Sequence, residues 1–308
     1  MFLLPAISAC SQQPGKPDEG RFSVVCTVFP QYDWVRQILG DKIDGMDLTL
    51  LSNGRIDLHN YQPSVDDIAK IVTCDLFIYV GGESDAWADD VLKQAANKSM
   101  AVINLLAALG EKAKEEEIIA GMEADDGEDE MAYDEHVWLS LKNAGIFCPA
   151  IADALSALDD DNSGEYKNNL LAYAEKLSAL DAKYREAISA APVKTLLFGD
   201  RFPFRYLADD YGLDYHAAFA GCSAETEASF ETIIFLASKV DELDLKTIMV
   251  TESSDQAIAK TIIDNTAAKN QRILVLDAMQ SMTAEDVKNA TYLSIMENNL
   301  KVLKEALK

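Results

Sequence analysis

The fold is decided by residues 57–82, which read DLHNYQPSVDDIAKIVTCDLFIYVGG. The part DLFIYV at 75–80 is an apolar run of strand length that stops at two glycines, so it predicts a buried strand. Ahead of it, Ser64 precedes an acidic turn and then apolar residues, which predicts a helix over 64–72 with Ser64 as its N-cap. A helix that leads into a buried strand is typical of a parallel sheet with helices on its faces.

The same alternation of strands and helices continues on both sides of this stretch. Strands are predicted at 22–30, 46–51 and 101–105, with a helix at 31–40. Helices are predicted at 142–157 and at 163–190, where apolar residues recur every three or four positions until Pro192. The pattern then resumes, with strands at 194–198, 214–219, 246–250 and 272–276, and helices at 203–211, 229–242, 255–268 and 291–307.

This order predicts an α/β protein with two Rossmann-like lobes, each with a parallel sheet, joined by a long rigid helix. The expected divisions are a tether, a first lobe, a linking helix and a second lobe, at 1–21, 22–160, 161–191 and 192–308. In open α/β folds ligand groups gather at the carboxyl ends of the strands. A binding site is therefore expected in the cleft between the lobes.

Acidic residues outnumber basic ones, and the formal net charge is −25. Such a surface repels phosphate backbones and argues against nucleic-acid binding. Residues 115–135 contain eleven Asp or Glu and no Lys or Arg, which predicts a mobile acidic loop. The loop is either a solvated insertion without function or a weak, fast-exchanging ligand for cations.

The first residues, MFLLPAISAC, resemble a bacterial lipobox that ends at Cys10 and is followed by a polar tether. The resemblance implies that Cys10 is diacylated and anchors the protein outside the cytoplasm, although a chance cysteine in an apolar terminus is the alternative. No other stretch has the ~18 apolar residues that a membrane span needs. The five cysteines form no close pair, so a thiolate zinc cluster is not predicted.

Histidine occurs only three times, and two of the three lie between predicted elements. His59 lies in DLHNYQPS and His136 in DEHVWL, and imidazole is the commonest metal ligand. His216 lies inside a predicted strand and is interpreted as a packing or surface residue.

Three segments together resemble the zinc- and manganese-binding proteins of ABC importers, known as cluster A-I. Residues 57–70 resemble that family's DPHxYEPSPxDIAKL, residues 134–139 its DPHVWLDP, and residues 219–229 its GxSPExEPS. The resemblance covers about residues 22–308, with the motifs in the family's order.

The resemblance implies a metal site with four ligands, two from each lobe. His59 and His136 match the two histidines of the first lobe, and Asp277 matches the carboxylate of the second. The remaining ligand is histidine or glutamate in the family, and Asp200 is the nearest carboxylate here, with Glu252 in reserve.

Two imidazoles and two carboxylates form a closed N₂O₂ set that suits zinc, and manganese if the carboxylates widen the coordination. The usual order of affinity among divalent transition metals favours zinc over manganese at such a site. Arg201 next to this set either repels the metal or balances surplus carboxylates.

The predicted function is that of an extracytoplasmic solute-binding protein that captures Zn²⁺, in preference to Mn²⁺, as transport substrate. It implies delivery to an ABC permease by a monomer that touches the membrane only through its lipid anchor. One alternative is a metal-dependent hydrolase with Glu252 as base, although neither HExxH nor a nucleophile elbow occurs. The other alternative is a metal-binding surface adhesin.

Overall fold

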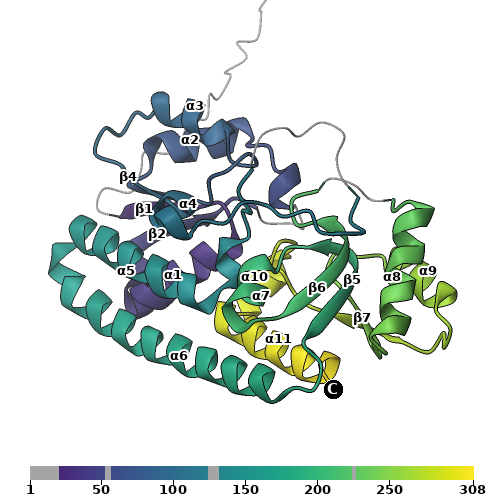
Figure 1. Cartoon of the computed structure of the whole chain (residues 1–308). Coiled ribbons are helices and arrows are strands. Elements are labelled where there is room, and N and C mark those ends of the chain that lie inside the picture. The colour runs from purple at the N-terminus through teal and green to yellow at the C-terminus, as the bar shows by residue number, and fades with distance from the viewer. Residues whose placement is uncertain (1–20, 53–56, 124–131, 224–226) are drawn as a thin grey trace, which may run out of the picture.

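The computed structural model describes residues 21–52, 57–123, 132–223 and 227–308. The expected lipidation site Cys10 and most of the tether lie outside these residues. Two four-stranded sheets form the centres of two lobes (Figure 1). The first, in the order β2-β1-β3-β4, contains β1 (Phe22–Cys26), β2 (Met46–Leu50), β3 (Leu76–Tyr79) and β4 (Ala101–Asn104). The second, in the order β6-β5-β7-β8, contains β5 (Thr195–Phe202), β6 (Asp214–Ala220), β7 (Thr247–Val250) and β8 (Arg272–Val275).

All strand pairs within the two sheets are parallel, which confirms the α/β prediction. Helices connect the strands: α1 (Phe29–Leu39), α2 (Val65–Thr73), α3 (Trp87–Lys93), α4 (Leu105–Leu109), α5 (Leu141–Leu158), α6 (Ser163–Ala190), α7 (Arg205–Tyr211), α8 (Phe230–Glu242), α9 (Ala257–Asn265), α10 (Ala284–Asn289) and α11 (Tyr292–Ala306). Short 3₁₀ turns add η1 (Gly40–Gly45), η2 (Leu58–Asn60), η3 (Gly110–Lys112), η4 (Val137–Leu139) and η5 (Asp160–Asn162).

Local sequence accounts for where several elements begin and end. Ser64 caps α2, because its hydroxyl accepts the Asp67 N–H at 3.2 Å while the Asp67 carboxylate accepts the Ser64 N–H at 3.0 Å. The strand expected at 22–30 stops at Cys26 instead, and Pro30 lies in the first turn of α1. Proline is favoured there because the first helical N–H groups have no intrahelical partner.

Helix α6 is the expected long helix, and it runs past both lobes along one side of the molecule (Figure 1). At the first lobe, the Asn169 amide donates to the carbonyl of Ile38 in α1 at 3.0 Å. At the second lobe, the Tyr184 hydroxyl donates to the carbonyl of Met296 in α11 at 2.6 Å. The helix is therefore fixed to both lobes rather than to one.

The lobes also share one hydrophobic core. A single cluster of buried side chains includes Val24 of the first sheet and Phe198 of the second. Trp138 is central to it: its indole N–H donates to the Ala278 carbonyl at 2.9 Å, and its own carbonyl accepts the Tyr292 hydroxyl at 2.7 Å. Because apolar packing is continuous from lobe to lobe, large separations of the lobes would expose core surface to water.

The ends of the acidic segment are held in place, unlike the mobile loop expected for 115–135. Glu115 and Tyr133 form an antiparallel bridge, and the Glu123 N–H donates to the Ala218 carbonyl of β6 at 3.0 Å. Backbone hydrogen bonds do not depend on side-chain charge, and Met122 in this segment is buried in the core. Residues 124–131 lie outside the described part of the chain.

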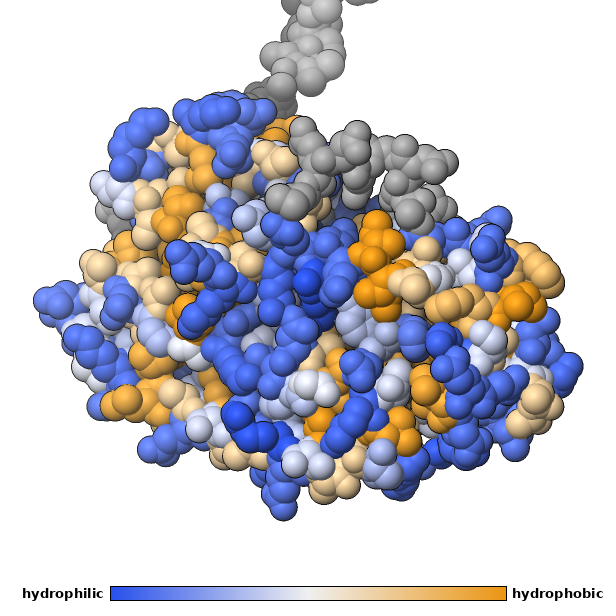
Figure 2. Space-filling model, viewed as in Figure 1, coloured by the Kyte–Doolittle hydropathy of each residue, from blue (hydrophilic) through white to orange (hydrophobic). Residues whose placement is uncertain are grey.

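The surface in Figure 2 is mostly hydrophilic on both lobes, with apolar side chains in small groups. In the described part of the chain, no helix combines the length and apolar character that crossing a bilayer requires.

Candidate metal centre

His59 lies in η2, which follows the first-lobe strand β2 and begins at Leu58, with Asp57 as its N-cap. The Asp57 carboxylate caps this turn by accepting the His59 N–H at 3.0 Å. His136 directly precedes η4 and is completely buried. The Asp134 carboxylate accepts both the backbone N–H of His136, at 2.8 Å, and its ring Nδ1, at 3.0 Å. Each histidine therefore has its backbone N–H held by an aspartate two residues before it, and Asp134 also holds the ring of His136.

The two imidazoles face each other. Their Nε2 atoms are 3.1 Å apart, and the ring centroids are 5.1 Å apart. Two Zn–N bonds of ~2.0–2.1 Å at a tetrahedral angle place the nitrogens roughly 3.3 Å apart. The observed separation is therefore suited to chelation of one ion.

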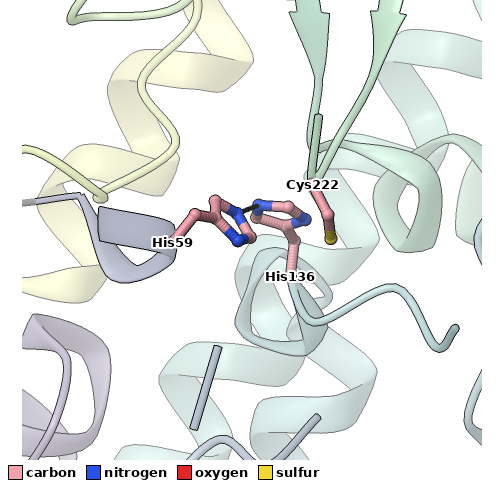
Figure 3. Close-up of side chains that lie close together, drawn as sticks. All are labelled: His59, His136 and Cys222. Atoms are coloured by element: carbon pink, nitrogen blue, oxygen red, sulfur yellow. Dashed lines mark hydrogen bonds between the residues drawn. The ribbon is translucent and has the colours of Figure 1, made fainter. Parts of the chain in front are cut away.

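Cys222 is the third member of the group, and it follows β6 of the second lobe. One donor atom from each of His59, His136 and Cys222 lies within 4.8 Å of the other two (Figure 3). A Cβ on Gly221 would be 3.1 Å from the His136 ring and 2.9 Å from the Phe202 carbonyl oxygen. Glycine at this position therefore lets the end of β6 approach the imidazole.

Burial and neighbouring charges set the protonation of the group. Burial and the facing His136 lower the pKa of His59 to about 3, so this ring is neutral at ordinary pH. Burial also disfavours charge on His136, but the carboxylates of Asp134, Glu135 and Asp57 together outweigh it and raise the pKa of His136. Burial, Asp134 and Glu116 raise the pKa of the Cys222 thiol. A bound cation favours the thiolate over the thiol.

Gln280 also reaches the histidine pair. Its side-chain Nε2 lies 2.9 Å from His136 Nε2, and the residue is buried. The carboxamide carries an oxygen on the same carbon, so rotation of the amide offers an oxygen donor to an ion at this point. The turn that carries Gln280 is fixed, since its backbone N–H donates to Glu252 Oε1 at 2.9 Å.

Asp200 lines a cavity of about 290 Å³ together with His59, but both of its oxygens already accept hydrogen bonds. One oxygen accepts the Arg201 N–H at 2.8 Å, and the other accepts the Thr251 N–H at 3.0 Å and the Thr251 hydroxyl at 2.6 Å. These bonds tie the extended end of β5 to the end of β7.

Glu252 and Asp277 lie apart from the histidine group, on a different cavity of about 700 Å³. Glu252 accepts the N–H groups of Ala278, Gln280 and Ser281, at 2.8, 2.9 and 3.2 Å. Asp277 accepts the Met279 N–H at 2.8 Å. Burial and the neighbouring Asp277 raise the pKa of Glu252 to about 7, and burial raises the pKa of Asp277.

Arg201 forms an ion pair that crosses between the lobes. Its Nη2 lies 2.7 Å from Asp57 Oδ2, and both side chains are mostly buried. The guanidinium is paired with the aspartate that caps the His59 turn, and its positive charge also contributes to lowering the pKa of His59.

His59 and Cys222 also line a second cavity, of about 240 Å³. Carboxylates line it, namely Glu83, Glu116, Glu123 and Glu135. Negative charge concentrated in a recess attracts cations and raises their local concentration. The approach to the histidine pair is therefore favourable for a metal ion.

Cys222 and Gln280 were not predicted from the sequence as members of this group. The signal for Cys222 was its position directly after the predicted strand 214–219, at the same type of strand end that singled out the histidines. Gln280 lies on a turn after β8, and its amide is not a residue type that suggests metal binding. His216, expected to pack or lie on the surface, lies in β6 with its ring against Phe235.

Comparisons with known proteins agree with a metal site. A family model described as zinc-uptake complex component A, periplasmic, matches residues 24–306. The zinc-binding lipoprotein AdcA of Streptococcus pneumoniae is 33% identical over 302 residues, which cover 96% of this chain and 58% of AdcA. The high-affinity zinc uptake system protein ZnuA of Bacillus subtilis is 30% identical over 309 residues, which cover 99% of this chain and 94% of ZnuA.

The fold has been seen with zinc bound. The crystal structure of the Zn(II)-bound ZnuA-like domain of S. pneumoniae AdcA has a TM-score of 0.72 and 31% identity, and covers 94% of this chain and 99% of that domain. The chain spans only a little more than half the length of the whole AdcA protein.

Proposed function

Because the chain belongs to the family of periplasmic zinc-uptake complex component A, we propose that it captures zinc outside the cytoplasm for an ABC importer. The observation that carries this function is the convergence of His59, His136 and Cys222, whose donor atoms come from both lobes and lie within 4.8 Å of one another. Family members are metal-binding components of transport systems, and this chain has no chemical reaction to perform on the ion.

The proposed ligands are the two imidazoles and the Cys222 thiolate, with the Gln280 amide beside the fourth position. The thiolate is a soft ligand, which zinc accepts and manganese, a hard ion, does not favour. In the sequence-derived alternative, Asp200 or Glu252 would have to share or give up backbone N–H groups that both of their oxygens accept, whereas Asp277 accepts the Met279 N–H through Oδ1. We therefore assign those carboxylates to holding the loops of the second lobe.

Capture and release need only small movements. The shared core, α6 and the Arg201–Asp57 ion pair all connect the lobes. An ion that enters between them exchanges its water for nitrogen and sulfur donors. Docking on a membrane permease then supplies the free energy that loosens these contacts and frees the ion.

The anchor remains part of this proposal. Diacylation of Cys10 would hold the protein at the outer face of the cell membrane, where a monomer can meet its permease. AdcA of S. pneumoniae is named a lipoprotein, which supports the proposal.

A hydrolase is not favoured by the site. The candidate base Glu252 accepts three backbone N–H groups and lines a different cavity from the histidine pair. A base for a metal-bound water must lie within hydrogen-bond reach of that water.

Titration of the purified protein with Zn²⁺ and Mn²⁺, in competition with a chromophoric chelator, tests the function. We expect one tightly bound zinc per chain, much weaker manganese binding, and a melting temperature that falls when a chelator removes the ion. Zinc binding no tighter than that of manganese, or a melting temperature that ignores zinc, would contradict the proposal.

A further inference from the structure

Glu135, which lies between Asp134 and His136 in the sequence, has one carboxylate oxygen with a hydrogen-bond partner and one without a partner among the described residues. Its Oε1 accepts the Ser84 N–H at 2.8 Å. Its Oε2 is buried, has no hydrogen-bond partner among the described residues, and lies 3.5 Å from His59 Nδ1. The side chain is only 3% exposed. Burying a carboxylate oxygen without a hydrogen-bond partner costs free energy. We therefore expect a functional state of the protein in which this oxygen has a hydrogen-bond donor.

The backbone makes room for this carboxylate. Gly82 has φ +82°, and a Cβ there would lie 2.3 Å from Glu135 Oε1. Both the absence of a side chain and the left-handed conformation at residue 82 are therefore needed for the observed position of Glu135.

Hydrogen bonding fixes the tautomer of His136. An ionised carboxylate can only accept, so the Asp134 oxygen at 3.0 Å places the ring hydrogen of His136 on Nδ1. The Nε2 of the neutral His136 ring then carries a lone pair. This lone pair faces the Gln280 amide nitrogen at 2.9 Å and the His59 Nε2 at 3.1 Å, and the Ser84 hydroxyl lies 2.8 Å from His59 Nδ1.

Metal binding through the two facing nitrogens fixes the tautomer of His59. Both Nε2 atoms must then present lone pairs to the ion, so the ring hydrogen of His59 must be on Nδ1. This hydrogen needs an acceptor on the Nδ1 side of the ring. Glu135 Oε2 is there, and a carboxylate accepts such a hydrogen bond more strongly than the neutral Ser84 hydroxyl.

We infer that Glu135 is a positioning residue that accepts the Nδ1–H of His59 when zinc binds, as Asp134 does for His136. The inference rests on the proposed function. Two carboxylates adjacent in sequence then each hold one imidazole in its metal-binding tautomer. No atom of Glu135 needs to touch the ion, and the shift from 3.5 Å to hydrogen-bond distance is small.

The test compares zinc affinity in the unaltered chain, Glu135→Gln and Glu83→Gln. Glu83→Gln is the matched control, because Glu83 lines the same cavity as Glu135 but is exposed. Loss of a carboxylate that orients a metal-binding histidine lowers affinity about 10- to 100-fold. We expect such a loss in Glu135→Gln, and a change of no more than about threefold in Glu83→Gln, because an exposed charge is screened by solvent.

Two further readouts separate positioning from other roles. Long-range ¹H–¹⁵N correlations of the histidine rings in the zinc-loaded protein should place the His59 hydrogen on Nδ1, with a less downfield resonance in Glu135→Gln. X-ray absorption at the zinc edge should give the same number of ligands in both proteins. Melting of the zinc-free Glu135→Gln variant should be at least as high as that of the unaltered chain, because a buried charge has been removed.

The results that overturn the inference are distinct. Equal zinc affinity in the unaltered chain and Glu135→Gln removes the positioning role and leaves the proposed function intact. Loss of an oxygen ligand in the variant makes Glu135 a direct ligand and contradicts the inference. Equal losses of zinc affinity in Glu135→Gln and Glu83→Gln would show that the effect comes from the negative charge of the cavity in general, which contradicts a positioning role for Glu135. Failure of the unaltered chain to bind zinc overturns the proposed function and this inference with it.

Discussion

The two lobes carry different chemistry at the carboxyl ends of their strands. In the first lobe, His59 and His136 turn ring nitrogens toward each other, 3.1 Å apart. In the second lobe, Glu252 turns both of its oxygens toward backbone N–H groups instead, and Asp277 turns Oδ1 toward the Met279 N–H. What the second lobe offers the histidine pair is Cys222 and the side-chain amide of Gln280.

The difference shows that residue type and position at a strand end do not by themselves make a ligand. A carboxylate whose oxygens already accept backbone N–H groups stabilises a loop, and it would leave those donors unpaired if it turned to a metal. A side chain is available to an ion when its donor atoms lack such partners. Variants in both lobes test this contrast, in order of decreasing effect.

Loss of a first-lobe imidazole should change zinc binding most. We expect His136→Ala to lower zinc affinity roughly 100- to 1,000-fold. This loss corresponds to about one quarter of the binding free energy of a four-ligand zinc site, since one of four ligands is removed. His216→Ala is the matched control and should bind zinc like the unaltered chain, since His216 packs on Phe235 away from the site. Isothermal titration or chelator competition measures both. Similar losses of zinc affinity in His136→Ala and His216→Ala would contradict the assignment of His136 as a ligand.

Cys222→Ser should have the next largest effect, because it replaces a soft thiolate by a hydroxyl that stays protonated. We expect a loss of about 10- to 100-fold in zinc affinity, with a smaller change for manganese, so that the preference for zinc narrows. Asp277→Asn, which tests the sequence-derived ligand, should change zinc affinity by less than about threefold. Competition titrations of both variants with Zn²⁺ and Mn²⁺ measure these changes. A larger loss of zinc affinity in Asp277→Asn than in Cys222→Ser would favour the carboxylate ligands predicted from the sequence.

Glu252→Gln should affect stability rather than zinc binding. The carboxylate accepts three backbone N–H groups with two oxygens, whereas glutamine has one acceptor oxygen and adds donors. We expect the free energy of unfolding to fall by about 1–3 kcal/mol in urea denaturation of the zinc-free protein. Glu297→Gln, on the exposed face of α11, should change it by less than about 0.5 kcal/mol. An unchanged stability with a large loss of zinc affinity would make Glu252 a ligand.

The first lobe has its own buried carboxylate, Asp85, whose Oδ2 accepts the N–H groups of Val80 and Gly81. Burial, with a smaller contribution from Glu135, raises its pKa from 3.8 to about 7. Between these values the folded state binds more protons than the unfolded state, so this group lowers the free energy of unfolding as pH rises from about 4 to 7.

The slope from one such group is at most about 1.4 kcal/mol per pH unit. Asp85→Asn should therefore flatten the pH dependence of stability over this range, measured by urea denaturation at several pH values. Identical profiles for the variant and the unaltered chain would show that Asp85 does not titrate between its unfolded and folded pKa.

Much of the fold could be predicted because buried parallel strands appear in sequence as short apolar runs. The run at 246–250 became β7, and the apolar stripe at 163–190 became α6. The end of β5 was missed because it continues through Gly199, Asp200 and Arg201, whose composition is not typical of a strand. Helices such as α10 were missed because six residues are too few to show a helical period.

The site was only partly predictable. His59 and His136 were expected to lie together from their positions and the family resemblance, and they do. Asp277 was predicted from the family resemblance, and Asp200 was predicted as the carboxylate nearest to the family's remaining ligand. Sequence cannot show which backbone N–H groups such a carboxylate will accept. Cys222 lacked a nearby cysteine or histidine in sequence, so no spacing rule connected it to the site.

Anomalous diffraction at the zinc absorption edge, from crystals of the zinc-loaded protein, would locate the ion itself. We expect a single peak between the lobes, ~2.0–2.1 Å from a ring nitrogen of His59 and of His136 and ~2.3 Å from Cys222 Sγ. A peak bound instead by Asp277 with Glu252 or Asp200, with Cys222 Sγ out of bonding distance, would contradict the proposed ligand set.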